Sequence, residues 1–181
     1  MITIVPYDIS WPALFTVEAA SIRETLGALA LRVEHVGSTS VPGLAAKPVV
    51  DIQVSVPTLE PLFVYLQRLA HIGYTHVPLG EFDLVYPFFQ KPATSPSTYH
   101  IHLCAIGSEL ELRHLAFRDY LRDHPAVAAE YLELKRKLAA ANHGTTLESR
   151  ERYSLSKTQF VTAVLEQALS EGHPSPHRND A

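Results

Sequence analysis

The segment from Val49 to Val56, VVDIQVSV, constrains the fold of this chain more than any other. Its β-branched residues favour an extended strand, and its alternation separates an apolar face from a polar one. The apolar side chains are those of Val50, Ile52, Val54 and Val56. The polar side chains are those of Asp51, Gln53 and Ser55. Polar groups within such a strand usually face a functional site, so we expect a site beside the polar face.

Asp51 is the residue of this strand that most needs an explanation. Burying a carboxylate is costly unless it is paired or binds a cation. Asp51 therefore either belongs to a functional site, or caps a neighbouring turn, or pairs with Lys47 or an arginine. The upstream pair Gly37-Ser38 favours the functional interpretation. Glycine lets the backbone approach a phosphate closely, and Ser38 offers an amide and a hydroxyl as donors.

The remaining pattern predicts a mixed α/β region followed by helices. The other expected strands span residues 31–36, 74–77, 84–89 and 99–105. Pro87 makes the strand over 84–89 an edge strand or a bulge. The expected helices cover residues 10–29, 59–70, 111–122, 127–138 and 145–169. A capping box of Thr145 and Glu148 begins the last helix, and Gly172 follows its end.

A change of character near residue 109 predicts the domain organisation. We expect a core of residues 1–108, a helical extension of residues 109–171 packed on it, and a disordered tail of residues 172–181. With 181 residues, 46% of them hydrophobic, the chain is large enough to bury such a core. Its single cysteine excludes a disulfide framework and an all-cysteine zinc site. We expect no role for His124, at a helix end, or for His173 and His177, in the tail.

Charge and hydropathy exclude several classes of partner. The net charge of −4 lacks the basic excess of a general nucleic-acid binder. The first residues resemble no secretory signal, and no apolar run reaches the roughly 18 residues that span a bilayer. We therefore expect a cytoplasmic protein whose partner is a small molecule or a nucleotide, with no nucleic acid and no membrane as partners. The sequence leaves the oligomeric state open.

Three motifs, in order along the chain, resemble the GrpB-like family, a branch of the nucleotidyltransferase superfamily. They are VEHVGSTSVPGLAAKPVVDI at residues 33–52, HIH at 100–102 and HLAFRDYLR at 114–122. The resemblance ends near Tyr153, Lys157 and Phe160, so it covers nearly the whole chain except the tail. It implies an α/β (α+β) fold, in which a nucleotidyltransferase-like mixed sheet is flanked by helices and followed by a C-terminal helical extension.

The superfamily pattern also implies a set of site residues. A Gly-Ser pair binds the nucleotide phosphates there, which assigns that role to Gly37 and Ser38. Two acidic residues separated by one position, with a third on a neighbouring strand, hold two divalent metals. Asp51 matches the first acid, but Gln53 occupies the second position. A neutral amide oxygen lacks the charge that a two-metal site needs, so this departure argues against ordinary two-metal transfer.

His100 and His102 offer a replacement for the missing charge. The two residues are two positions apart on an expected strand, so both imidazoles point to one face. If that strand neighbours Asp51, the three residues form a metal-binding set. The expected cofactor is a divalent metal, Mg or Mn, with Zn or Fe also compatible because imidazole is a borderline ligand. In the structural alternative, both histidines bond to the backbone and fill a half-polar strand face.

Four further residues are candidates for the same site, each with a structural alternative. His35 is either a core histidine or a general acid or base beside the phosphate site. Lys47 neutralises a phosphate or pairs with Asp51. Arg118 contacts an anionic ligand, or belongs to a solvated basic stripe of its helix. Lys157 projects into the cleft between core and helices, or extends outward to solvent.

The leading functional hypothesis is metal-dependent transfer of a nucleotidyl or phosphoryl group to a small molecule. In this hypothesis Asp51 and His35 are catalytic, Gly37, Ser38, Lys47, Arg118 and Lys157 bind phosphate, and Asp51, His100 and His102 bind metal. One alternative is other metal-dependent chemistry at a repurposed Asp/His site. The second is a non-catalytic module that binds a ligand or assists a partner.

Overall fold

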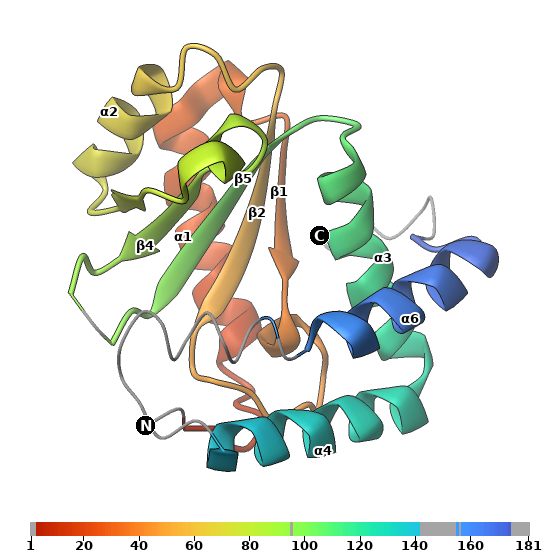
Figure 1. Ribbon diagram of the computed structural model, residues 1–181. Helices are drawn as coiled ribbons and strands as arrows, with labels where there is room; N and C mark the ends of the chain where they lie inside the picture. The colour runs from red at the N-terminus through yellow and green to blue at the C-terminus, as the bar shows by residue number, and fades with distance from the viewer. Residues whose placement is uncertain (1–2, 95, 142–154, 156, 175–181) are drawn as a thin grey trace.

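A five-stranded mixed sheet organises the protein (Figure 1), seen in a computed structural model that describes residues 3–94, 96–141, 155 and 157–174. Its strands are β1 (Arg32–Val36), β2 (Val50–Val56), β3 (Thr75–Val77), β4 (Phe88–Lys91) and β5 (Tyr99–Ala105). Their order is β1-β2-β5-β4-β3, with β2 and β5 parallel and the other neighbours antiparallel. The two strands that carry the predicted metal ligands are therefore neighbours, with three strands outside them.

Helices cover both faces of the sheet (Figure 1). They are α1 (Trp11–Leu26), α2 (Phe63–His71), α3 (Glu109–Asp123), α4 (Pro125–Ala141) and α6 (Thr158–Ser170). The apolar side chains of β2 pack with α1 and α2 in the main core. A second core joins α3, α4 and α6 to Val41 and Leu44, in the loop before β2. Helices α3, α4 and α6 thus pack on the segment that follows the Gly37-Ser38 pair.

The predicted mixed sheet with flanking helices is confirmed, but the predicted strand over residues 84–89 is wrong. Residues Gly80–Leu84 form a 3-10 helix, and β4 begins only at Phe88. Proline lacks an amide donor, so a strand paired on both sides cannot run through Pro87 and begins directly after it. The carbonyl of Pro87 still accepts a hydrogen bond from the amide of Leu103 at 3.0 Å.

Several helix boundaries also differ from the prediction. Helix α3 begins at Glu109 because Ser108 caps it, its side chain accepting a hydrogen bond from the amide of Glu111. Helix α6 is described from Thr158 and ends at Ser170, before Gly172 as predicted, whereas Thr145 and Glu148 lie outside the described residues. Within the described part of the chain, no helix has both the length and the apolar character needed to cross a bilayer.

Candidate functional site

The pairing of β2 with β5 brings the three predicted metal ligands together. Asp51 pairs with His100 and Gln53 with His102, so the side chains share the sheet face opposite α1. Asp51 Oδ1 lies 3.2 Å from His100 Nδ1 and 3.2 Å from His102 Nε2. Burial raises the pKa of Asp51, but hydrogen bonds and charge from both histidines outweigh it and hold the pKa well below its usual value.

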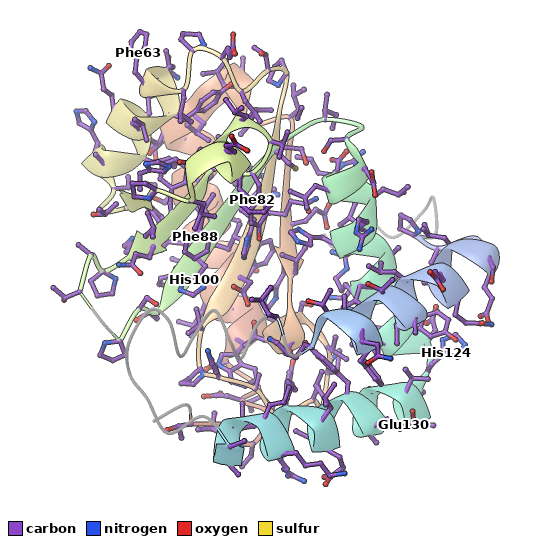
Figure 2. The ribbon with its side chains drawn as sticks, viewed as in Figure 1. Phe63, Phe82, Phe88, His100, His124 and Glu130 are labelled. Atoms are coloured by element: carbon purple, nitrogen blue, oxygen red, sulfur yellow. The ribbon has the colours of Figure 1, made fainter. Side chains whose placement is uncertain are left out.

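The far sides of both imidazoles are also held in place. His100 Nε2 lies 2.8 Å from the hydroxyl of Ser97, and His102 Nδ1 bonds to the hydroxyl of Tyr86. The ring of Phe88, on the neighbouring strand β4, packs against His100 at 4.8 Å between centroids (Figure 2). Metal-binding histidines usually have their second ring nitrogen bonded in this way, which fixes the tautomer and the ring orientation.

Gly37 joins β1 to the 3-10 helix Ser38–Ser40 at the edge of this group. Its φ of +68° lies in the left-handed region that favours glycine. A Cβ added there would lie 2.5 Å from Asp51 Oδ2, which is closer than any real contact. Only glycine allows the backbone to pass so close to the carboxylate. The Gly37-Ser38 pair and Asp51 thus lie beside the same cavity.

A cavity of about 580 Å³ lies over these residues. Its lining includes Gly37, Ser38, Asp51, His100 and His102. Its basic lining residues are Lys47, Arg113, Lys135 and Lys157, whereas Asp51 is the single acidic residue among the described lining. The volume suits a small-molecule ligand, and the excess of basic groups favours an anionic one.

Lys135, on α4, and Lys157, which directly precedes α6, both line the cavity. Burial lowers the pKa of Lys157 to about 8, Lys47 lowers it further, and Asp51 opposes the change. Burial, together with Lys157 and Arg136, lowers the pKa of Lys135 to about 7. Lys135 Nζ donates a hydrogen bond to the carbonyl of Ala45 at 2.6 Å.

Sequence reasoning missed Lys135, although a signal was present. On α4 it follows Tyr131 by four positions and precedes Ala139 by four, and all three side chains are buried. A lysine at this spacing within an apolar helical stripe indicates a buried or cleft-facing side chain.

Gln53, at the position where a two-metal site would have its second acid, bonds to a further histidine and does not line the cavity. His114 Nδ1 donates a hydrogen bond to Gln53 Oε1 at 2.8 Å. Burial lowers the pKa of His114 to about 3, with His102 and Arg113 adding to the effect and Asp51 opposing it. A neutral His114 is therefore part of the site's wall, a role that its place in a basic helical stripe did not predict.

His35 does not belong to the site, which corrects the expectation of a catalytic role. It pairs with Ile52 and so points to the α1 side of the sheet. There its ring stacks on Phe15 at 4.9 Å, and its Nε2 lies 3.0 Å from the hydroxyl of Thr39. His35 is therefore a core histidine whose ring is held by its neighbours, as in the structural alternative.

Arg118 is also not among the residues that line the cavity, contrary to the expectation of an anion contact. Its side chain is 2% exposed, which equally rules out the solvated stripe. The guanidinium donates to Asp119 Oδ1 and Glu34 Oε2, both at 2.8 Å, and to the carbonyl of His35 at 3.1 Å. Arg118 thus joins α3 to β1.

The donor atoms around Asp51 are of the types that bind divalent metals, but their spacing does not suit a single ion. Among the described residues, Asp51, His100 and His102 do not offer three ligand atoms that all lie within 4.8 Å of one another. Because Asp51 Oδ1 lies 3.2 Å from each ring, the distance that exceeds 4.8 Å is the one between His100 Nδ1 and His102 Nε2. Two nitrogens that share one metal at about 2.1 Å lie at most about 4.2 Å apart. The two rings must therefore move closer for both to bind one ion.

The sequence model of the family described as "GrpB protein" matches residues 1–167. This chain belongs to the GrpB family. The crystal structure of the conserved protein GrpB from Enterococcus faecalis has 36% sequence identity and a TM-score of 0.80, covering 93% of this chain and 98% of that one. The GrpB fold is therefore that of the sheet and helices in Figure 1.

Relatives that are longer than this chain share the same region. The UPF0157 protein YqkA from Bacillus subtilis is 32% identical over 92% of this chain, which spans 47% of its length. A dephospho-CoA kinase from Mycolicibacterium paratuberculosis is 29% identical over 75% of this chain and 40% of its own length. A GrpB region thus occurs within longer proteins.

Proposed function

We propose that this GrpB protein is a metal-dependent enzyme of the nucleotidyltransferase type, which transfers a nucleotidyl or phosphoryl group to a small molecule. One observation carries the proposal. The Gly37-Ser38 pair, the carboxylate of Asp51 and the basic side chains of Lys47 and Lys157 line the same cavity. These groups are far apart in the sequence, and together they offer what a phosphate-bearing ligand and its cation require.

The charge of the cavity contrasts with that of the whole chain. The protein has a net charge of −4, yet basic residues predominate around Asp51. A cavity with such a bias attracts anions to a protein that otherwise repels them. Phosphate groups facing Lys135 and Lys157 would restore the full charge of these two lysines, whose pKa burial lowers.

Each group then has a role in the proposed reaction. Gly37 and Ser38 bind and orient the phosphates through the backbone, and Lys47 and Lys157 neutralise their charge. Asp51, His100 and His102 would hold a divalent ion, Mg or Mn, or Zn or Fe. Such an ion, when bound, would supply a Lewis acid for a phosphoryl oxygen. Tyr86 and Ser97 hold the two imidazoles in position.

Two similarities support this class of reaction. The motif over residues 33–52 resembles that of nucleotidyltransferases, and its Gly-Ser pair and Asp51 are adjacent in space. The match to part of a protein named dephospho-CoA kinase adds a relative whose name denotes phosphoryl transfer.

The first test measures binding of ATP with Mn²⁺ to the Asp51→Asn variant. At a nucleotide concentration a hundred times the Kd, the wild-type protein should gain about 2.7 kcal/mol of stability. Asp51→Asn should lose most of this gain, because the variant removes the only acidic group of the described lining. Thermal unfolding and calorimetry measure both quantities.

Asp83→Asn is the matched control for this test. Asp83 also bonds to a histidine, His76, at 3.2 Å, but it does not line the cavity. Its replacement should leave nucleotide binding unchanged. Equal stabilisation of wild type and Asp51→Asn would contradict the proposal.

The second test uses pH and sulfate, an anion whose charge is constant over the range tested. Lys135 and Lys157 have pKa values near 7 and 8, so their positive charge is present below these values and lost above them. Sulfate affinity should therefore fall as pH rises from 6 to 9, by about tenfold or more. Lys157→Met should remove the step near pH 8, and Lys137→Met, at an exposed position of the same helical layer, should not. A flat affinity profile would argue against anion binding at these lysines.

A second candidate function rests on the bond between Gln53 and His114. With Gln53 held by a neutral imidazole, the site resembles a single-metal centre with histidine ligands rather than a two-metal one. Stabilisation by Zn²⁺ or Mn²⁺ without nucleotide would favour other metal-dependent chemistry. A lack of response to both metal and nucleotide would favour a non-catalytic module.

A further inference from the structure

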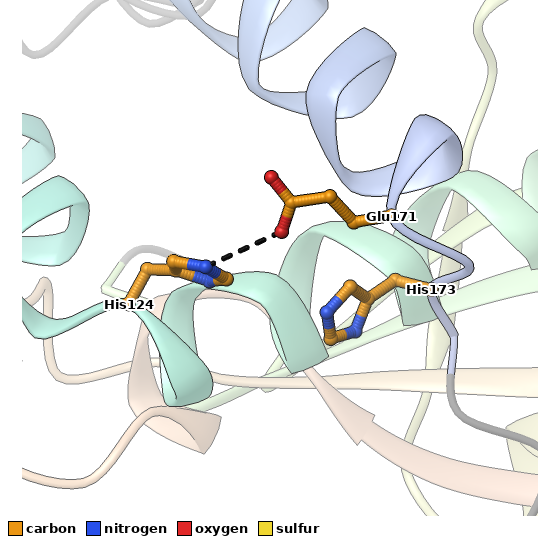
Figure 3. A group of neighbouring side chains, drawn as sticks. All are labelled: His124, Glu171 and His173. Atoms are coloured by element: carbon orange, nitrogen blue, oxygen red, sulfur yellow. Dashed lines mark ion pairs between the residues drawn. The ribbon is translucent and has the colours of Figure 1, made fainter.

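A second group of possible metal ligands lies where α3 and α4 meet the end of α6 (Figure 3). It consists of His124, between α3 and α4, and of Glu171 and His173, after α6. One ligand atom from each residue lies within 4.8 Å of those of the other two. No role was expected for His124 or His173, because no pattern in the sequence shows that α6 returns to the α3–α4 junction.

The end of α6 places its two ligands by a standard backbone motif. The amide of Gly172 donates to the carbonyl of Leu169 at 3.2 Å, and that of His173 donates to Ala168 at 2.9 Å. With Gly172 at a φ of +85°, these bonds make a Schellman motif. The motif turns the chain sharply, so Glu171 and His173 both reach His124 from one side.

The hydrogen bond of His124 leaves a lone pair facing a carboxylate. His124 Nδ1 lies 2.9 Å from the carbonyl of Tyr120 and must donate to it, because a carbonyl only accepts. In the neutral ring, Nε2 then carries a lone pair, and it lies 3.4 Å from Glu171 Oε2. Two acceptors this close need a proton or a metal cation between them.

His173 supplies an independent observation. Its side chain is 9% exposed, and its Nδ1 is buried with no hydrogen-bond partner in the described part of the chain. Its Nε2 lies 3.9 Å from Asp123 Oδ2, which is beyond hydrogen-bond distance. Buried imidazole nitrogens are rarely left unbonded, so the His173 ring still has a polar atom in need of a partner.

Tyr120 holds both rings in place before any ion binds. His124 stacks on Tyr120 at 3.8 Å between centroids, and His173 meets the same ring edge-on at 5.5 Å. Because Tyr120 also belongs to the core shared by α3, α4 and α6, the ligand positions are set by packing.

We propose that His124, Glu171 and His173 form a zinc-class metal site that joins the α3–α4 junction to the end of α6. Two histidines and one glutamate are a ligand set that zinc accepts, with the fourth position left for water. The separation of 3.4 Å between His124 Nε2 and Glu171 Oε2 equals the roughly 3.4 Å expected for two ligands of a tetrahedral zinc ion. The Nδ1 bond of His124 to a backbone carbonyl is the usual orienting contact of a metal-bound imidazole. The site is separate from the cavity and does not depend on the proposed function.

The test counts zinc ions bound to tag-free, full-length protein by competition with a chromophoric chelator. The wild type should bind one zinc ion more than His173→Asn or His124→Asn, both of which keep the cavity residues intact. Zinc at a hundred times its Kd should raise the Tm of the wild type by about 5 to 10 °C beyond that of the variants. Asparagine at position 124 retains a donor for the Tyr120 carbonyl, so the helix end stays capped.

His71→Asn is the matched control. His71 Nδ1 makes the same kind of bond to a carbonyl four residues earlier, that of Gln67 at 2.7 Å. Among the described residues, no other histidine ring contacts it. Its replacement should leave the zinc count unchanged. If His173→Asn fails to fold, Glu171→Gln, at a side chain that is 38% exposed, takes its place. Equal zinc counts in wild type and the site variants, or no zinc bound by the wild type, would overturn the proposal and leave a protonated His124–Glu171 ion pair.

Discussion

Arg118→Met is expected to lower the free energy of unfolding by about 3–5 kcal/mol. The variant leaves two carboxylates without their main cation: that of Asp119, which is 1% exposed, and that of Glu34, which is 12% exposed. It also removes the bond to the carbonyl of His35, through which α3 is joined to β1. Breaking a buried ion pair from one side costs far more than the net worth of the pair. Urea denaturation at pH 7 measures the loss.

Arg113→Met is the control on the same helix. Arg113 is 40% exposed and pairs with the exposed Glu109, so its loss should cost about 0.5 kcal/mol or less. If Arg118→Met proved as mild as Arg113→Met, the buried network would not have the structural role assigned to it.

Gly37→Ala is expected to have the second large effect, lowering stability by about 2–5 kcal/mol. Alanine at a φ of +68° is strained, and its Cβ would lie 2.5 Å from Asp51 Oδ2 and 3.0 Å from Asp51 Cβ. The clash pushes the carboxylate away from His100 and His102. Nucleotide binding with Mn²⁺ should therefore be lost even where the variant remains folded, which circular dichroism and calorimetry measure together.

Gly43→Ala separates strain from clash. Gly43 has a φ of +77°, but a Cβ there would meet nothing within 4 Å. This variant should lower the free energy of unfolding by the backbone strain alone, about 1–2 kcal/mol, and should leave nucleotide binding intact. A Gly37→Ala protein that bound nucleotide as well as Gly43→Ala would show that the close approach to Asp51 is unimportant.

Local pattern predicted the parts of the fold that depend on neighbouring residues. The alternation over Val49–Val56 and over Tyr99–Ala105 identified β2 and β5, and the spacing of two on β5 predicted that His100 and His102 share a face. The expectation that these two strands are neighbours rested only on the family resemblance. The pairing of β2 with β5 is long-range, and no local signal in either strand specifies its partner.

The roles of side chains that depend on tertiary packing could not be predicted from local sequence patterns. His35 is close in sequence to Gly37, which lies against Asp51, but the β1 pleat sends His35 to the α1 side. Arg118 was expected to contact an anionic ligand or to lie on a solvated stripe, because its actual partner Glu34 is 84 positions away in the sequence. Lys135 and His114 join the cavity through helices that fold back over the sheet, which no periodicity within one helix predicts.

The segment from Glu34 to Thr39 contacts every layer of the molecule in turn. Glu34 bonds to α3, His35 stacks on α1, and Gly37 lies against Asp51. A protein that had lost all chemistry at the cavity would still need these residues to hold its layers together. A relative that retains this motif is therefore expected to keep the fold. Whether it also keeps the site is better judged from the side chains at the positions of Asp51, His100 and His102.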